Sequence, residues 1–145
     1  MEFRLEGALD SVRLPKPSPS QRASGLWQHT CFEIFWQPDG GENYHEFNLA
    51  PSNQWAAYGF DSYREGMRDA DIGAIALASG YNVSNGQGVL ELKASIAADL
   101  AAPAKAGLSA VIELTDGTLQ YWALAFPPGK PDFHAAVCRP LSLSR

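Results

Sequence analysis

The sequence predicts an all-β fold, an antiparallel β-sandwich of the immunoglobulin-like or jelly-roll type, on three observations. Most segments alternate apolar and polar side chains with a period of two, as half-buried strands do. These segments are short, and Pro, Gly, Asn and Asp separate them, which is typical of sandwiches. Hydrophobic residues make up 46% of the 145 residues, so the chain can bury a core as one domain spanning residues 1–145.

The N-terminal half supplies the first four expected strands. An aromatic segment at residues 31–36 places Phe32, Ile34 and Trp36 on one face, which we expect to be the core face. Turn residues end this segment and predict a hairpin with the next strand. A loop rich in Pro and Ser at residues 15–24 separates the first strand from the others. The four strands are expected at residues 3–9, 31–36, 44–50 and 55–60.

The C-terminal half shows the same periodicity. Leu90 and Leu92 alternate with Glu91 in a well-patterned segment, and Asp116-Gly117 predicts a tight hairpin between the last two strands. The alanine-rich residues 97–106 predict one or two helical turns, limited by a proline. Residues 72–78 fit a helix or a strand, and we assign a strand because the neighbouring segments are strands. The four strands are expected at residues 72–78, 89–97, 108–114 and 119–126.

Charge and composition exclude several classes of protein. The formal net charge is −5 and the basic residues are scattered, which argues against a nucleic-acid-binding face. No apolar run approaches the roughly 20 residues of a membrane span. The first residues carry charges at positions 2, 4 and 6 and no apolar stretch, so we expect no secretory signal and a cytoplasmic protein. Cys31 and Cys138 are expected to be free buried thiols, with a disulfide as the alternative.

Enzyme and metal signatures are missing from the sequence. It contains no nucleophile elbow, zincin helix, phosphate-binding loop or dinucleotide fingerprint, so we expect no catalytic residues. Asp132 and His134 remain a candidate proton-transfer pair, although a structural contact between them is favoured. His29 and Cys31 offer two metal ligands, which do not make a site.

Haem is the one cofactor that the residue types bring into consideration. Met67 with His29, His45 or His134 would form an axial pair, but the chain has no CxxCH attachment motif. Core packing of Met67 is favoured, and we expect no bound cofactor.

A ligand site is the strongest functional indication. Residues 26–67 hold three of the four tryptophans beside several hydrogen-bonding side chains. Aromatic faces stack on sugar rings, and Glu46 and Asn48 share a strand face from which they would grip neighbouring hydroxyls. The alternative is that the polar groups form a buried network that fixes strand register. The candidate ligand-binding residues are Trp55, Trp122, Glu46, Asn48, Arg64, Glu33 and Trp27.

Four blocks of sequence, GLWQHTCFEIFW, YHEFNLAPSNQWAAYGFDSYREGM, GLSAVIEL and YWALAFPPGKPDFH, resemble a family of small bacterial DOMON-like proteins related to the family-nine carbohydrate-binding modules. The resemblance spans about residues 22–134. It implies a β-sandwich with a ligand pocket at one face and sugar or haem as candidate ligands. It also implies a sugar held between two tryptophans, for which Trp55 and Trp122 are the candidates and Trp27 the next.

Two departures from the family pattern bear on this expectation. Relatives often carry a further N-terminal strand, which would be missing here, and Phe126 stands where many have a histidine, which weakens the haem alternative. We therefore expect a non-catalytic binding domain for a carbohydrate or a similar small polar ligand. The alternatives are a haem-binding DOMON cytochrome, a hydrolase using Asp132 and His134, and a structural domain that forms homo-oligomers through a sheet edge.

Overall fold

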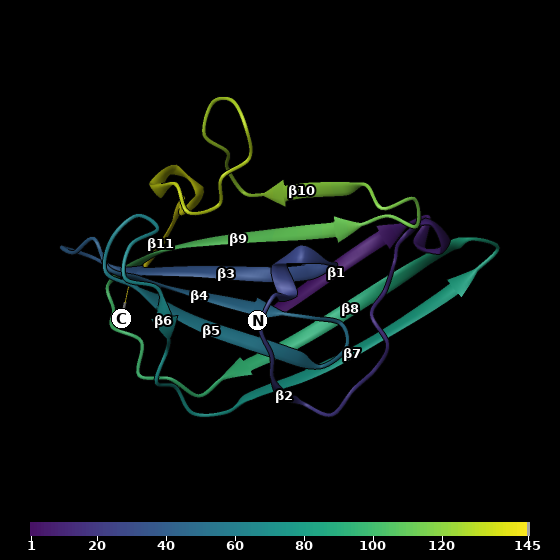
Figure 1. The fold of residues 1–145 in the computed structure, drawn as a ribbon, viewed down its shortest axis with the longest axis horizontal. Coiled ribbons are helices and arrows are strands. Elements are labelled where there is room, and N and C mark those ends of the chain that lie inside the picture. Colours follow the sequence, from purple (N-terminus) through teal and green to yellow (C-terminus); the bar gives the residue numbers. More distant parts are fainter. Residues whose placement is uncertain (145) are drawn as a thin grey trace.

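The structure, a computed structural model that describes residues 1–144, is a β-sandwich of two unequal sheets (Figure 1). The small sheet has the order β1-β8-β7, and the large sheet has the order β10-β9-β3-β4-β5-β2, with β11 added beside β9 and β6 beside β5. The strands of the small sheet are β1 (Glu2–Gly7), β7 (Ile75–Ser84) and β8 (Gln87–Ile96). Those of the large sheet are β2 (Gln21–Arg22), β3 (Cys31–Pro38), β4 (Tyr44–Leu49), β5 (Gln54–Phe60), β6 (Arg68–Asp69), β9 (Ala104–Glu113), β10 (Leu119–Ala123) and β11 (Leu141–Leu143). Three short 3₁₀ helices are η1 (Leu9–Ser11), η2 (Leu26–Gln28) and η3 (Ala136–Cys138).

The all-β fold class predicted from the periodicity is confirmed, and the expected hairpins β3–β4 and β9–β10 are antiparallel. One short pair, β2 with β5, is parallel. The strand expected at residues 72–78 lies further along the chain, as β7, and pairs with β8 through a turn at Asn85-Gly86. Both turn residues have positive φ, 52° and 78°, which is the geometry of the tight hairpin turn that Asn-Gly favours.

The prediction of one or two helical turns from the alanine content of residues 97–106 is wrong. Residues 97–103 are irregular, and β9 begins at Ala104. The main chain of β9 pairs with β3 on one side and with β10 and β11 on the other, so tertiary pairing outweighs the helix propensity of alanine.

The inner face of the large sheet packs against the small sheet and forms the main core. Phe32, Ile34 and Phe47 from the large sheet contribute to one buried cluster with Leu90 and Leu92 from the small sheet. Trp36 packs against this cluster, so the core face predicted for β3 is confirmed.

In the part of the chain that the structure describes, no second sheet lies over the outer face of the large sheet. A separate aromatic cluster lies there, and η2, the loop after β5 and the segment after β10 partly cover it. Polar side chains interrupt this cluster on β3, β4 and β9, and they define the site described below. No helix in the described part of the chain has the length and apolar character needed to cross a membrane.

Candidate functional site

A cavity of about 350 Å³ opens on the outer face of the large sheet. Its floor is formed by alternate residues of β3, β4 and β9, and its rim by η2, the loop after β5 and the segment that contains His134. Ligand pockets usually measure roughly 300–1,000 Å³, so this one suits a small molecule. The lining residues are Trp27, Glu33, Phe35, Glu46, Phe60, Arg64, Met67, Val111, Tyr121, Pro131, Asp132, Phe133 and His134.

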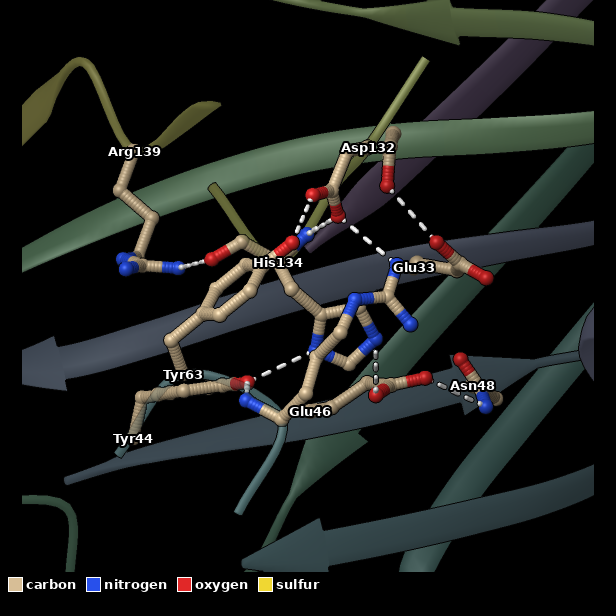
Figure 2. Close-up of polar contacts among 10 residues, drawn as sticks. Glu33, Tyr44, Glu46, Asn48, Tyr63, Asp132, His134 and Arg139 are labelled. Atoms are coloured by element: carbon tan, nitrogen blue, oxygen red, sulfur yellow. Dashed lines mark hydrogen bonds and ion pairs between the residues drawn. The ribbon is translucent and has the colours of Figure 1, made fainter. Parts of the chain in front are cut away.

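Two buried carboxyl groups lie on the floor. Glu33 on β3 and Glu46 on β4 are 3% and 5% exposed, and Asn48, which pairs across the sheet with Glu33, is fully buried beside them (Figure 2). The Ser109 hydroxyl donates a 3.0 Å hydrogen bond to Glu33 Oε2, and Asn48 Nδ2 donates one of the same length to Glu46 Oε1. Asn48 Oδ1 is buried without a hydrogen-bond partner among residues 1–144.

Burial changes the acidity of both carboxyl groups. It raises the pKa of Glu33 to about 8, and the negative charge of Glu46 adds to the shift. Burial also raises the pKa of Glu46 to about 7, against the opposing effects of the Asn48 hydrogen bond and the Arg64 charge. Both groups are therefore protonated near pH 6 in the free protein.

His134 lies between β4 and the rim (Figure 2). Its Nδ1 is 2.7 Å from the Tyr44 hydroxyl and its Nε2 is 3.6 Å from Glu46 Oε2. Burial, together with the charges of Arg64 and Arg139, lowers the pKa of His134 to about 4, so the ring is neutral at pH 7 and its approach to Glu46 is not an ion pair. An arrangement in which Tyr44 donates to Nδ1 leaves the ring proton on Nε2, where it faces Glu46.

Asp132 joins the two loops of the rim. Its carboxylate accepts a 2.8 Å hydrogen bond from Arg64 Nη2, a bond from the Tyr63 hydroxyl and a 3.1 Å bond from the backbone N–H of His134. The contact between Asp132 and His134 is thus made through the main chain, and the imidazole nitrogens face Tyr44 and Glu46 instead.

The walls of the cavity are aromatic. Trp27 on η2 is partly exposed and packs edge-on against Tyr58, with ring centroids 5.9 Å apart. Tyr121 on β10 is 44% exposed, and its ring meets that of Phe133 at 6.0 Å. Phe35 and Phe60 complete the apolar surface. Trp27 and Tyr121, the exposed rings of this lining, offer faces on which a flat apolar surface of a ligand can stack.

The structure brings together five of the seven residues proposed from the sequence. Trp27, Glu33, Glu46 and Arg64 line the cavity, and Asn48 hydrogen-bonds to one of them. Trp55 and Trp122 lie on the other face of the sheet, because they pair with the core residues Leu49 and Ala110 and so point inward with them. Trp55 is half-buried under the Arg22 guanidinium, 4.8 Å away, and Trp122 lies over a separate apolar pocket beside η1.

Sequence reasoning missed the other aromatic lining residues. Tyr121 is the immediate neighbour of Trp122 on β10, so it must point to the opposite face. Likewise Phe60 shares the face of Glu46, since Glu46 pairs with Tyr58 two residues earlier. Tyr121 and Phe60 can be identified as lining residues only once the pairing register of their strands is known.

The residues considered for metal or haem binding are dispersed. His29 hydrogen-bonds to Glu113 at 2.8 Å, and His45 stacks on Phe47 at the inner face. Met67 and His134 both line the cavity, but iron at His134 Nδ1 would have to displace the Tyr44 hydroxyl. Within residues 1–144, no group of three or more His, Cys, Asp or Glu side chains is placed to hold a metal ion. Cys31 and Cys138 are buried free thiols.

Comparisons with protein-family models, with curated proteins and with solved structures found no match to this chain.

Proposed function

We propose that this protein is a non-catalytic binding protein for a small polar ligand, and that the ligand is a carbohydrate. The observation that carries the proposal is one cavity that combines exposed aromatic walls with buried hydrogen-bonding groups on a rigid sheet. Sugars have apolar C–H faces and hydroxyl edges, and they need both kinds of surface. The resemblance of the sequence to DOMON-like proteins and family-nine modules supports the same proposal. We also propose that the protein is cytoplasmic.

The direct test is calorimetry with a panel of mono- and disaccharides, using two neighbouring residues of β10 as a matched pair. Tyr121 lines the cavity and Trp122 points to the opposite face, yet both are substantially exposed. Stacking on an aromatic ring contributes about 0.5–1.5 kcal/mol beyond area burial, so Tyr121→Ala should weaken binding roughly tenfold. Trp122→Ala should leave the affinity unchanged. A loss in the Trp122 variant alone, or no binding of any sugar to the wild type, would contradict the proposal.

A glycoside hydrolase is the second candidate, and one observation favours it. Two carboxyl groups with pKa values of about 7 and 8 line the same cavity, and a raised pKa is what a general acid at neutral pH requires. Release of nitrophenol from nitrophenyl glycosides, abolished by Glu46→Gln, would establish hydrolysis. Our proposal expects sugar binding without turnover.

A further inference from the structure

The floor of the cavity has a surplus of hydrogen-bond acceptors. Within residues 1–144, the one side-chain partner of Glu33 is the Ser109 hydroxyl, which leaves acceptor capacity on its carboxyl group. Next to Glu46 on the same strand face, Asn48 Oδ1 is buried without a hydrogen-bond partner among residues 1–144. When the two carboxyl groups are ionised, the floor therefore has acceptors without matching donors, and a ligand that fills it should bring the donors.

Among residues 1–144, no lysine or arginine forms an ion pair with either carboxyl group, although the Arg64 charge acts on Glu46 from the rim. Among the described residues none lies within ion-pair distance of Glu33, and the one side chain within that distance of Glu46, His134, is neutral. Arg64 is held at the rim by Asp132, and Arg139 bonds to Gln37 and to the His134 carbonyl. A buried carboxylate without a partner is costly, so the ionised floor is incomplete without a cation from outside the chain.

Other titratable groups facing the cavity do not supply that cation. Burial raises the pKa of Cys31, Tyr44 and Tyr58, so these groups are neutral at pH 7. Glu113 lies further along the same face, where Arg13 and His29 are its partners. The remaining titratable groups on the rim and walls are Tyr63, Tyr121, Asp132 and Cys138.

The walls suit a cation as well as a sugar. Trp27 and Tyr121 are exposed rings that line the same cavity as the carboxyl groups, and aromatic faces attract an ammonium group through their quadrupoles. An ammonium group has three N–H donors and no acceptor, which matches the free acceptors of the floor. The aromatic faces of the walls and the polar side chains of the rim suit the rest of a sugar ring, with its apolar faces and its hydroxyl groups.

We propose that the ligand is an amino sugar whose protonated amine binds between Glu33 and Glu46. This inference rests on the proposed function, of which it specifies the ligand class. Binding then ionises at least one of the two carboxyl groups, and the released proton passes to solvent. Near pH 6.5, where both groups start largely protonated, at least one proton per bound ligand should be released.

The test is calorimetry of the wild-type protein at pH 6.5 with glucosamine, galactosamine and mannosamine. Each is compared with its parent hexose and its N-acetyl derivative, which lack the charge. Repeating the titrations in two buffers of different ionisation enthalpy counts the protons released. We expect at least one hexosamine to bind at least tenfold more tightly than both neutral counterparts, with a release of one to two protons.

Glu33→Gln and Glu46→Gln provide the matched variants, because each keeps the shape and removes one ionisable group. Each should reduce the hexosamine preference to less than threefold and lower the proton release. Glu91→Gln, at an exposed site on the small sheet, makes the same substitution away from the cavity and should preserve the preference.

The possible outcomes separate this inference from the proposed function. Equal affinity for a hexosamine and its hexose, a preference without proton release, or a preference that survives in both cavity variants would overturn the amine inference and leave sugar binding intact. Absence of binding by every hexose and hexosamine would overturn both.

Discussion

At pH 8, the Glu33→Gln variant is expected to have a higher free energy of unfolding than the wild type, by about 2 kcal/mol or more. At pH 5 the two should agree within about 1 kcal/mol. The reason is that Glu33 is buried without a cation and its pKa is raised to about 8, so its ionisation opposes folding, whereas glutamine stays neutral. Urea denaturation at the two pH values measures the difference.

The sign of the pH dependence follows from three groups. Between about pH 4.5 and the folded-state pKa values of about 8 for Glu33 and 7 for Glu46, the unfolded chain binds fewer protons, so stability falls as pH rises. His134, with its pKa lowered to about 4, acts oppositely between pH 4 and 6.5. Two carboxyl groups outweigh one imidazole, so the wild type should lose a few kcal/mol between pH 5 and 8.

Glu113→Gln is the control for this prediction. Glu113 is equally buried on the same face, but Arg13 and His29 lie 2.7 and 2.8 Å from its carboxylate oxygens. Removing its charge should therefore destabilise the protein at pH 8, the opposite of Glu33→Gln. If Glu33→Gln also destabilised the protein at pH 8, Glu33 would be a paired carboxylate and the description of the floor would be wrong.

Asp132→Ala is expected to loosen the rim and to weaken ligand binding at least tenfold. The carboxylate holds Tyr63 and Arg64 from one loop and the His134 backbone from another, so all three contacts are lost together. Hydrogen bonds to a charged group contribute about 1.5–3 kcal/mol each when buried, and partial exposure of this one reduces the expected stability loss to about 2 kcal/mol. Amide hydrogen exchange should become faster at residues 61–67 and 131–134.

The matched control is Asp61→Ala in the same loop. Asp61 also accepts a 2.8 Å bond from an arginine, Arg68, but both side chains are largely exposed. Exposed pairs contribute little, so stability should change by less than about 0.5 kcal/mol and binding should be retained. Equal effects of the two variants would show that Asp132 does not hold the rim in place.

The strands were predictable from the sequence because alternation is a local property. The face shared by Phe32, Ile34 and Trp36, and the pair formed by Glu46 and Asn48, follow from period two alone. The assignment of Trp55 and Trp122 to the ligand required more than alternation. Which face of a strand points inward depends on how the strand pairs with its neighbours. A shift of the pairing register by one residue exchanges the inward and outward faces.

The rim was beyond prediction for a different reason. Residues 61–67 and 131–134 have no periodic pattern, and they meet only because the strands that precede them lie in one sheet. The sequence offered Asp132 and His134 as a pair, but the direction of Asp132 toward Tyr63 and Arg64, and of the His134 ring toward Tyr44 and Glu46, depends on the course of the chain after β10. The raised pKa values of Glu33 and Glu46 likewise depend on burial, which the sequence does not specify.

The most direct test of a sugar-binding cavity is an NMR titration of the ¹⁵N-labelled protein with the hexose and hexosamine panel. We expect chemical-shift changes at the side-chain amide of Asn48, at the indole of Trp27 and at the backbone of residues 131–134, all saturating together. Changes centred on the indoles of Trp55 and Trp122, or no changes with any sugar, would contradict the proposal of a sugar-binding cavity.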